Sequence, residues 1–301
     1  MFDWNDLRYF IAVAREGSTI AAAGSLKVNQ STVQRRLAVL EEKLGRKLVE
    51  RTPTGYRLTE LGQKALVHAQ GVEDTVAAFE RTLASSDTEL AGTIRVTCSE
   101  ADIYRLLTPV LARFGEKYPG LRVDFLITEA LLDLARGDAD IALRGGRPRD
   151  DTLIGRKIAD CPWVVFASRA YIARRGRPEC VQDLAHHAVI GFKGQLAESA
   201  TVRWLLAHAT SATMVAHSDS LLGALSAVKS GVGLAILPAY LGNAEDDIVQ
   251  VLDAPPDLAQ PLTMLVHPDL RHTPRVRAFF DFIVAEIDTL RPLLSGRTRY
   301  R

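Results

Sequence analysis

Hydrophobic residues recur every three or four positions in three successive segments of the first 45 residues. The first segment spans 7–15, the second spans 19–26 after a serine that can cap a helix, and the third begins near Gln30 and ends at Gly45. The inward-facing residues predicted for these helices are Leu7, Phe10, Ile11 and Ala14; Ala21, Ala22, Ala23 and Leu26; and Val33, Leu37 and Leu40. A turn at 27–29 separates the second and third helices, so the pattern predicts a helix-turn-helix.

The polar face of the third helix carries the side chains that matter chemically. They are Ser31, Thr32, Gln34, Arg35 and Arg36. Glutamine can pair with adenine through two hydrogen bonds, arginine with guanine or a phosphate, and a hydroxyl with several base edges. This face therefore predicts an element that enters a major groove of DNA. The alternative for the two arginines is an ion pair with Glu41 or Glu42 on a solvated helix face.

Two further elements follow the helix-turn-helix. Residues 47–58 hold Pro-Thr-Gly at 53–55 between two short apolar-bearing arms, which predicts a hairpin, or wing. From Thr59 a long helix is expected, with a stripe at coiled-coil spacing formed by Ala65, Ala69, Val72, Val76, Phe79 and Leu83. Dimerisation through this stripe is the physical expectation, and packing against the helix's own chain is the alternative. The residues Ser85, Ser86, Asp87 and Gly92 then predict a hinge.

Beyond the hinge, predicted strands alternate with helices, which is typical of an α/β domain. The first set of strands is 93–98, 121–127 and 139–143, with helices at 103–118 and 130–136. The second set is 163–167, 188–192, 213–217 and 233–237, with helices at 202–208 and 220–230. A last strand is predicted at 261–267 and a long amphipathic helix at 273–290, and their length and position indicate that the chain returns there to pack against the first set of strands.

Composition predicts a multidomain protein without a membrane segment. The chain has 301 residues, 47% of them hydrophobic, a mean hydropathy of +0.03 and no apolar run of membrane length. The acidic beginning Met-Phe-Asp-Trp-Asn-Asp is unlike a secretory signal, so a cytoplasmic location is expected. Cys98, Cys161 and Cys180 are widely spaced and fit reduced structural thiols. The net charge is only +1, but residues 1–60 hold ten Lys and Arg against seven Asp and Glu, a local excess that favours phosphate binding.

The N-terminal segment resembles the DNA-binding domain of LysR-type transcriptional regulators. The matching residues are Leu7-Arg8-Tyr9-Phe10, Gly17-Ser18, Ala21–Ala23, Gln34-Arg35-Arg36-Leu37, Leu40-Glu41-Glu42-Lys43-Leu44-Gly45, Leu48, Glu50-Arg51-Thr52, Leu58-Thr59 and Gly62. The resemblance implies a DNA-facing set of Gln30, Ser31, Thr32, Gln34 and Arg35, with Arg51 and Thr54 on the wing and Arg51 on a phosphate. The family usually has Pro at the position of Ser31 and Ser at that of Gln34, so the operator sequence cannot be carried over.

The resemblance continues through the rest of the chain. It is carried by Gly92-Thr93-Ile94-Arg95-Val96, Asp138-Ala139-Asp140-Ile141-Ala142-Leu143-Arg144, Gly231-Val232-Gly233-Leu234-Ala235-Ile236-Leu237-Pro238 and His267-Pro268-Asp269-Leu270-Arg271. It implies a two-lobed α/β effector domain like the periplasmic binding proteins. The expected organisation is a winged helix-turn-helix at 1–60, a linker helix and hinge at 61–91 and an effector domain at 92–295, with lobe I at 92–161 and 267–295 and lobe II at 162–266.

Candidate effector contacts lie where strands of the α/β domain end, because ligands settle at the carboxyl ends of such strands. Ser99 and Thr128 each follow a strand and precede a predicted helix, and helix capping is an equally good reading of both. Arg144 ends the third strand and can grip a carboxylate with two parallel hydrogen bonds, unless it pairs with Asp140 or Asp150. Phe192 and Ser218 are added from the second lobe. A small organic anion is the expected effector.

An enzyme is the main alternative from another class, and the motifs speak against it. The chain has no G-x-S-x-G, H-E-x-x-H or phosphate loop, and Gly231-Val232-Gly233 leads into a strand rather than a helix. His186 and His187 are adjacent, unlike the i, i+4 pairs that hold zinc, and Cys98 has no identifiable base. A solute-binding protein without DNA affinity is the third class. The sequence therefore predicts a homodimeric or homotetrameric DNA-binding regulator with a small-molecule effector and no metal, cofactor, catalytic residue or membrane contact. The basic segment 297–301 is expected to be solvated coil, although it could add a phosphate contact.

Overall fold

The structure is a computed structural model that describes residues 2–85, 90–128, 132–146 and 151–295. The chain divides into two units, Met1–Glu80 and Arg81–Arg301. Among the described residues, no helix combines the length and the apolar character needed to cross a bilayer. Of the predicted features, Ser86 and Asp87 of the hinge, Asp150 and the basic segment 297–301 lie outside the described residues.

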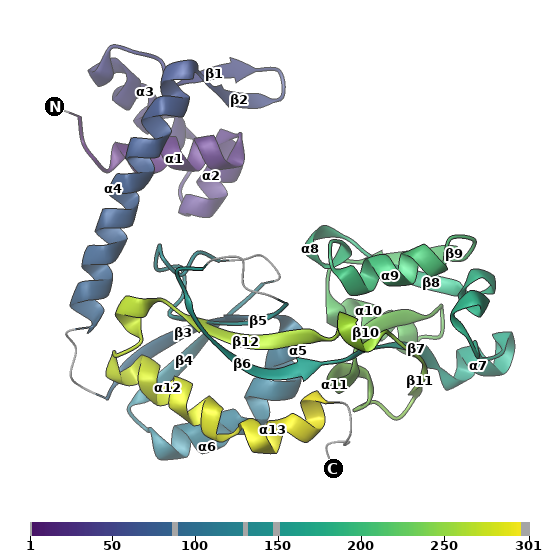
Figure 1. The fold of residues 1–301 in the computed structure, drawn as a ribbon. Coiled ribbons are helices and arrows are strands. Elements are labelled where there is room, and N and C mark those ends of the chain that lie inside the picture. Colours follow the sequence, from purple (N-terminus) through teal and green to yellow (C-terminus); the bar gives the residue numbers. More distant parts are fainter. Residues whose placement is uncertain (1, 86–89, 129–131, 147–150, 296–301) are drawn as a thin grey trace. The chain divides into compact units, whose positions relative to one another are not determined.

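Three helices form the body of the N-terminal unit, as the sequence predicts. They are α1 (Asp6–Glu16), α2 (Thr19–Leu26) and α3 (Gln30–Leu44) (Figure 1). Ser18 caps α2, because its hydroxyl accepts a hydrogen bond from the backbone N–H of Ala21 at 3.0 Å. Lys27 adopts the left-handed conformation that ends this helix and turns the chain into α3. Phe10, Val33 and Leu40 are fully buried between the helices, so their predicted core is confirmed.

The wing is a two-stranded antiparallel hairpin of β1 (Val49–Thr52) and β2 (Gly55–Leu58), joined by Pro53 and Thr54. Gly55 has a φ of +141°, and a Cβ there would lie 2.3 Å from the carbonyl oxygen of Gly17. The neighbouring N–H of Tyr56 donates to the same oxygen at 2.7 Å. A glycine is therefore needed where the wing approaches the end of α1.

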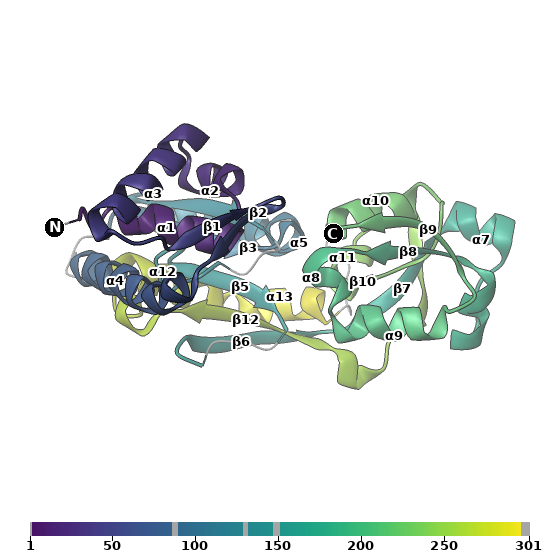
Figure 2. The same cartoon turned by 90° about the horizontal axis from the view of Figure 1, so that it is seen from above.

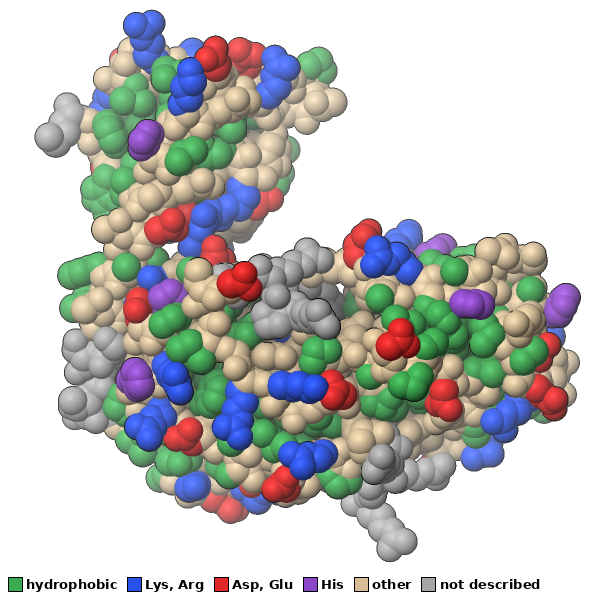
Figure 3. Space-filling model, viewed as in Figure 1, with side chains coloured by type: hydrophobic (Ala, Val, Ile, Leu, Met, Phe, Trp, Pro, Cys, Tyr) green, Lys and Arg blue, Asp and Glu red, His purple; other side chains and the backbone are tan. Residues whose placement is uncertain are grey.

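The long helix predicted after the wing is α4 (Glu60–Ser85), and its apolar stripe divides into two parts. Ala69 is buried in the core of the N-terminal unit, and Ala65 packs against that core. Further along the helix, Phe79 and Leu83 are 63% and 57% exposed and Val72 is 39% exposed. Hydrophobic side chains also lie at the surface of the N-terminal unit on the face shown in Figure 3. The first part of the stripe thus packs against its own chain, whereas Val72, Phe79 and Leu83 of the second part are exposed in the described part of the chain and Val76 is half-buried.

The first lobe of the second unit is built on a five-stranded sheet in the order β4-β3-β5-β12-β6. Its strands are β3 (Gly92–Cys98), β4 (Leu121–Ile127), β5 (Ile141–Gly145), β6 (Ile154–Cys161) and β12 (Gln260–Val266). Its helices are α5 (Glu100–Asp102), the π-helical turn η1 (Ile103–Leu107), α6 (Thr108–Lys117), η4 (Pro268–Leu270), α12 (Pro274–Ala285) and α13 (Ile287–Leu294). Phe114 of α6 stacks edge-on against Phe279 and Phe282 of α12, so the C-terminal helices return to this lobe as expected.

The second lobe contains a three-stranded antiparallel sheet and a parallel strand pair. Its strands are β7 (Trp163–Ser168), β8 (Ala188–Phe192), β9 (Thr213–Ser218), β10 (Ala235–Pro238) and β11 (Ile248–Asp253). Its helices are α7 (Arg169–Arg175), η2 (Val181–His186), α8 (Gly194–Ala197), α9 (Ala200–His208), α10 (Leu221–Lys229), α11 (Ala239–Gly242) and η3 (Pro256–Leu258). Figure 2 shows α9 and α10 on opposite sides of these strands.

Several sequence expectations for the second unit need correction. Strands β6 and β11 and helix α7 were not predicted, the helix expected at 103–118 contains a π-helical turn, and the one expected at 273–290 is two helices. In the helix expected at 130–136, residues 132 and 133 have no regular structure and 134–136 form a turn, while 130 and 131 lie outside the described residues. Strand β12 pairs with β5 and β6, so the chain re-enters the first lobe at Gln260 and not at 267.

Candidate functional site

The exposed face of α3 presents the side chains that the sequence assigns to DNA. Ser31, Gln34 and Arg35 are exposed, and Thr32 is half-buried. The Gln30 side chain is exposed overall, but its amide donates to the Thr19 hydroxyl at 3.0 Å, which joins α3 to α2. Within the described part of the chain, Arg35 makes no ion pair, so its alternative reading as a partner of Glu41 or Glu42 is not what the structure shows. Arg35 is available for an external partner.

Arg36 has a different role from its neighbour. Its guanidinium lies 3.3 Å from a carboxylate oxygen of Asp6, a residue that is fully buried, and 3.9 Å from Asp3. The alternative of an ion pair is thus right in kind, but the partners are Asp6 at the start of α1 and Asp3 before it, and not Glu41 or Glu42. Arg36 holds α3 against α1 and does not point outward as expected.

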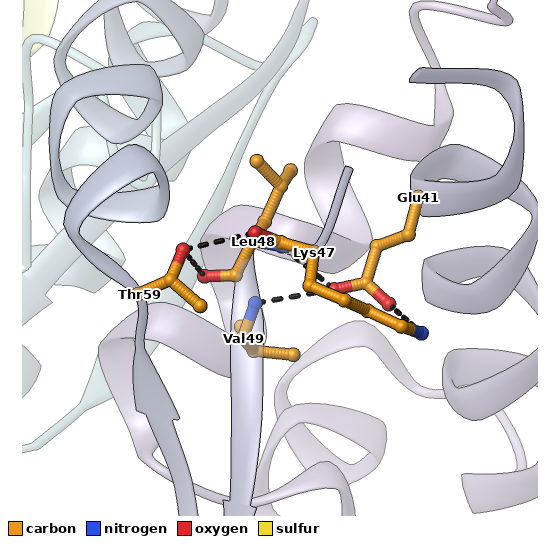
Figure 4. A network of polar contacts seen from close by, with 5 residues as sticks. All are labelled: Glu41, Lys47, Leu48, Val49 and Thr59. Atoms are coloured by element: carbon orange, nitrogen blue, oxygen red, sulfur yellow. Dashed lines mark hydrogen bonds and ion pairs between the residues drawn. The ribbon is translucent and has the colours of Figure 1, made fainter. Parts of the chain in front are cut away.

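Glu41 is a buried carboxylate that fastens the wing to α3 (Figure 4). One oxygen accepts hydrogen bonds from the backbone N–H groups of Leu48 and Val49 at 2.8 and 3.1 Å, and the other lies 2.6 Å from Lys47 Nζ. The hydrogen bond and charge of Glu41 raise the pKa of Lys47 above its ordinary value of 10.5. Thr59 completes the joint, because its hydroxyl donates to the carbonyl of Lys47. The wing is therefore held in a fixed position relative to α3.

The wing carries both residues expected there. Arg51 lies on β1 and Thr54 in the turn, and both side chains are exposed. Thr54 Oγ1 lies 3.4 Å from the hydroxyl of Thr52. No ion pair of Arg51 occurs among the residues the structure describes. An exposed arginine on a fixed hairpin is suited to a phosphate contact.

A cavity of about 660 Å³ lies between the two lobes of the second unit. Arg144, Ser99 and Leu134 line it from the first lobe, and Trp163 and Leu221 line it from the second. The remaining lining is about half apolar, as in pockets for small organic ligands, and it includes the carboxylates Asp102, Asp133, Glu198 and Asp257. Its size and position agree with an effector site at the ends of strands β3 and β5.

Two of the five side chains predicted to bind an effector line this cavity, namely Ser99 and Arg144. Thr128, Phe192 and Ser218 are not among the described residues that line it. Phe192 is buried in the hydrophobic core, and the Ser218 hydroxyl donates to the carbonyl of Ser220 at 2.7 Å. Thr128 contributes its carbonyl, which accepts a hydrogen bond from Arg144 at 3.2 Å. The prediction is corrected for these three side chains, because strand-end position does not decide which way a side chain points.

Ser99 and Arg144 are themselves held by neighbours. Ser99 accepts a hydrogen bond from the backbone N–H of Asp102, as a helix cap, and its hydroxyl donates to Asp102 Oδ2 at 2.7 Å. Arg144 donates to the hydroxyl of Thr97 at 2.6 Å. The carboxylate of Asp140, proposed as its alternative partner, accepts from the backbone N–H of Arg95 at 2.7 Å.

Sequence reasoning missed a buried carboxyl group in the cavity lining, that of Asp102. Asp102 lines it and is 3% exposed, and Tyr240 of the second lobe donates to its Oδ1 at 2.9 Å. Burial raises the pKa of Asp102, against the opposing effects of Ser99, Tyr240 and the charge of Arg144. The spacing of Ser99 and Asp102 reads as a helix cap, which hides this role. Tyr240 lies in α11, two residues after the end of β10, so the strand-end rule could have found it.

Comparison with known protein families decides the assignment. Residues 87–288, more than half of the chain, match the family described as "LysR substrate binding domain". Residues 4–63 match "Bacterial regulatory helix-turn-helix protein, lysR family". This chain belongs to the LysR family of transcriptional regulators.

Relatives of this LysR-type regulator are named as regulators and not as enzymes. The "HTH-type transcriptional regulator CrgA" of Neisseria meningitidis serogroup C is 31% identical over 293 residues, which cover 94% of this chain and 96% of CrgA. The solved structure of CrgA from Neisseria meningitidis is 28% identical, covers 95% of this chain and 99% of CrgA, and has a TM-score of 0.58. The full-length structure of AphB from Vibrio cholerae, 24% identical with a TM-score of 0.64, covers 94% of this chain and 99% of AphB and shows the same fold. The regulator is thus a DNA-binding protein with a substrate-binding domain.

Proposed function

We propose that this LysR-type regulator recognises its operator through Ser31, Thr32, Gln34 and Arg35 on α3, with Gln30 at the start of the helix and Arg51 and Thr54 on the wing. The observation that carries the proposal is the exposed Arg35 beside Gln34, which makes no ion pair among the described residues, on a helix whose wing is fixed by buried hydrogen bonds. Side chains held on a rigid scaffold can read base edges, while Arg51 binds a phosphate. Action on chromosomal DNA places the protein in the cytoplasm.

We further propose that two copies pair through α4. Exposed Phe79 and Leu83 lie four residues apart, so they share one face of the helix, and Val72 lies one heptad before Phe79. Exposure of such an apolar stripe to water costs free energy, which a second copy could recover by covering it. A two-fold dimer would place two recognition helices about 34 Å apart, and the operator would then be a pseudo-palindrome. Pairing of dimers into tetramers is compatible with this arrangement.

The interlobe cavity is proposed to bind a small organic anion through Arg144 and Ser99. A guanidinium at the wall of a partly apolar cavity attracts a carboxylate and orients it with two hydrogen bonds. Occupancy would change the equilibrium between lobe arrangements by the difference in the ligand's affinity for each. Operator binding would respond in turn.

The DNA-binding role is tested by an electrophoretic mobility shift with fragments flanking the regulator's own gene. Wild type should retard one fragment at low ionic strength, and random DNA of equal length should compete weakly. Failure to retard any flanking fragment would contradict the proposal. For the effector, thermal-shift screening of wild type and Arg144→Ala against small carboxylates should show stabilisation that the variant loses. Equal affinity in both proteins would refute the role of Arg144.

A further inference from the structure

The two lobes are joined on one side by a short segment of the first lobe, residues 99–105. Three of its side chains reach the second lobe: Glu100 accepts from the Ser220 hydroxyl at 3.1 Å, Asp102 from Tyr240 at 2.9 Å, and Arg105 forms an ion pair with Glu245. Of these three side chains, Asp102 alone lines the cavity described above. Asp102 is therefore both a link between the lobes and part of the ligand site.

Asp102 shares the cavity with a cation. Arg144, on β5, lines the same space, and its positive charge lowers the pKa of Asp102. Tyr240 from α11 and Cys161 from β6 also face this carboxyl group, and burial and the charge of Asp102 raise the pKa of the Cys161 thiol. On its own element, Glu100 is exposed and turned to Ser220. Among the described residues, Asp102 thus has Arg144, Tyr240, Cys161 and Ser99 around it, and Asp133, Glu198 and Asp257 are further carboxylates in the cavity lining.

The opposite charges of Arg144 and Asp102 in one cavity determine which chemical groups a ligand needs in order to bind there. Arg144 and Asp102 line the same cavity and their charges interact, so a carboxylate bound by Arg144 would meet the charge of Asp102, and buried carboxylates repel each other strongly. A ligand that also carries a hydrogen-bond donor beside its carboxylate converts this repulsion into attraction. Among the described residues, Asp102 Oδ2 accepts from the Ser99 hydroxyl and Oδ1 from the Tyr240 hydroxyl, and a carboxylate oxygen has two acceptor positions.

We propose that Asp102 is the specificity-determining residue of the cavity and selects carboxylates that carry a hydroxyl or ammonium group on the carbon next to the carboxylate. Arg144 binds the carboxylate end, and Asp102 accepts the hydrogen bond of the donor. This rests on the proposed effector site and narrows its ligand class from small anions to 2-hydroxy and 2-amino acids. Because Tyr240 donates to the same carboxylate, the ligand's donor would lie directly beside the contact between the lobes.

The proposal makes the pH dependence of binding differ between ligands. A plain carboxylate binds well only when Asp102 is protonated, so its affinity falls as the pH rises through the pKa of Asp102, by up to about tenfold per pH unit. Burial raises that pKa and brings this loss closer to neutral pH. An ammonium-bearing acid binds the ionised form, so its affinity rises over the same range. A hydroxy acid can donate to the ionised form without adding charge and should lose less than the plain acid.

The test is isothermal titration calorimetry of the full-length protein with two matched series of acids. The first series is butyrate, 2-hydroxybutyrate and 2-aminobutyrate, and the second is phenylacetate, mandelate and phenylglycine. Both enantiomers of each chiral acid are used. In at least one series, wild type should bind a donor-bearing acid about tenfold or more tightly than the plain acid at neutral pH. Asp102→Asn should bring this ratio close to one and remove the pH dependence of plain-acid binding. Glu100→Gln is the matched control, because Glu100 lies on the same element as Asp102 and also contacts the second lobe. Glu100 is not one of the described residues that line the cavity.

Circular dichroism and thermal melting establish that Asp102→Asn is folded, and Tyr240→Phe provides a second variant that leaves the carboxylate in place. Tyr240→Phe should keep the preference for donor-bearing acids. Equal affinity for plain and donor-bearing acids in wild type, an unchanged preference in Asp102→Asn, or failure of all six compounds to bind would overturn the assignment. None of these results would affect the retardation of DNA by the wild-type protein. Failure of wild type to retard DNA would contradict the DNA-binding role, and the titrations could still be interpreted.

Discussion

Replacing Glu41 by alanine should detach the wing from the recognition helix. The carboxylate is 5% exposed and accepts hydrogen bonds from the N–H groups of Leu48 and Val49 at 2.8 and 3.1 Å. Alanine leaves both donors without this partner, at a cost of about 1–3 kcal/mol for each buried group. The expected loss is therefore about 2–6 kcal/mol, a large part of the stability of a small domain.

Glu41→Gln is the matched control, because its amide oxygen can still accept from both N–H groups. It loses the ion pair with Lys47, which is 74% exposed and so contributes about 0–1 kcal/mol. The raised pKa of Lys47 means that this contribution is fully present below the ordinary pKa of lysine and is lost only as the pH rises through the raised value. The difference between Glu41→Gln and wild type should thus be small and constant around neutral pH.

Hydrogen exchange of peptides covering residues 47–58, read by mass spectrometry, measures local opening of the wing in the full-length protein. Calorimetry of the same samples reports any loss in the N-terminal unit. Glu41→Ala should show much faster exchange at the wing than Glu41→Gln, with the second unit unchanged. Equal and small effects, below about 1 kcal/mol, would show that the hydrogen bonds to Leu48 and Val49 do not hold the wing.

Three other predictions, which use four substitutions, follow from the same structure. Gly62→Ala should destabilise the N-terminal unit by about 2–4 kcal/mol in calorimetry, because the new Cβ would lie 1.9 Å from the Leu48 carbonyl oxygen. Gly71→Ala is the matched control: its Cβ would have no atom within 4 Å, so this change should stabilise α4 by about 0.5–1 kcal/mol. Effects of the same sign in the two variants would refute this packing. Phe79→Ser should raise the dimer dissociation constant about a hundredfold or more in sedimentation velocity, since each copy exposes 63% of that side chain, and unchanged association would place the interface elsewhere. Arg51→Ala should weaken binding on all DNA sequences and reduce the salt slope by about one, and an unaltered slope would exclude its phosphate contact.

Local patterns in the sequence predict most of the fold. The boundaries of α2, α3, the wing and β4 follow from a capping serine, glycine stops and hydrophobic spacing, all of which act within a few residues. The helix expected at 130–136 fails over its described part, because Asp133 and Asp138 stabilise a turn through hydrogen bonds to backbone N–H groups. Strand β6 carries mostly exposed or half-buried residues, so its hydrophobic signal is weak.

The two candidate sites likewise differ in how far local sequence patterns predict them. The DNA-facing residues lie on one short helix and one hairpin, where spacing determines direction, but Arg36 turns out to have a buried partner in Asp6, and Gln30 has one in Thr19. The effector cavity assembles residues from two lobes that are far apart in sequence, so the meeting of Asp102 with Tyr240 depends on a separation of 138 positions. The direction of Thr128, Phe192 and Ser218 likewise depends on tertiary packing that no local pattern records.

A footprint of the purified regulator on the DNA upstream of its own gene, with wild type and Arg35→Ala compared in parallel, tests the central claim most directly. The account predicts protection of two half-sites whose centres lie about 34 Å apart, and a loss of about 1–3 kcal/mol in specific binding for Arg35→Ala with little change on random DNA. Absence of any protected segment at low ionic strength, or equal losses on specific and random DNA, would contradict the assignment of α3 as the element that reads the operator.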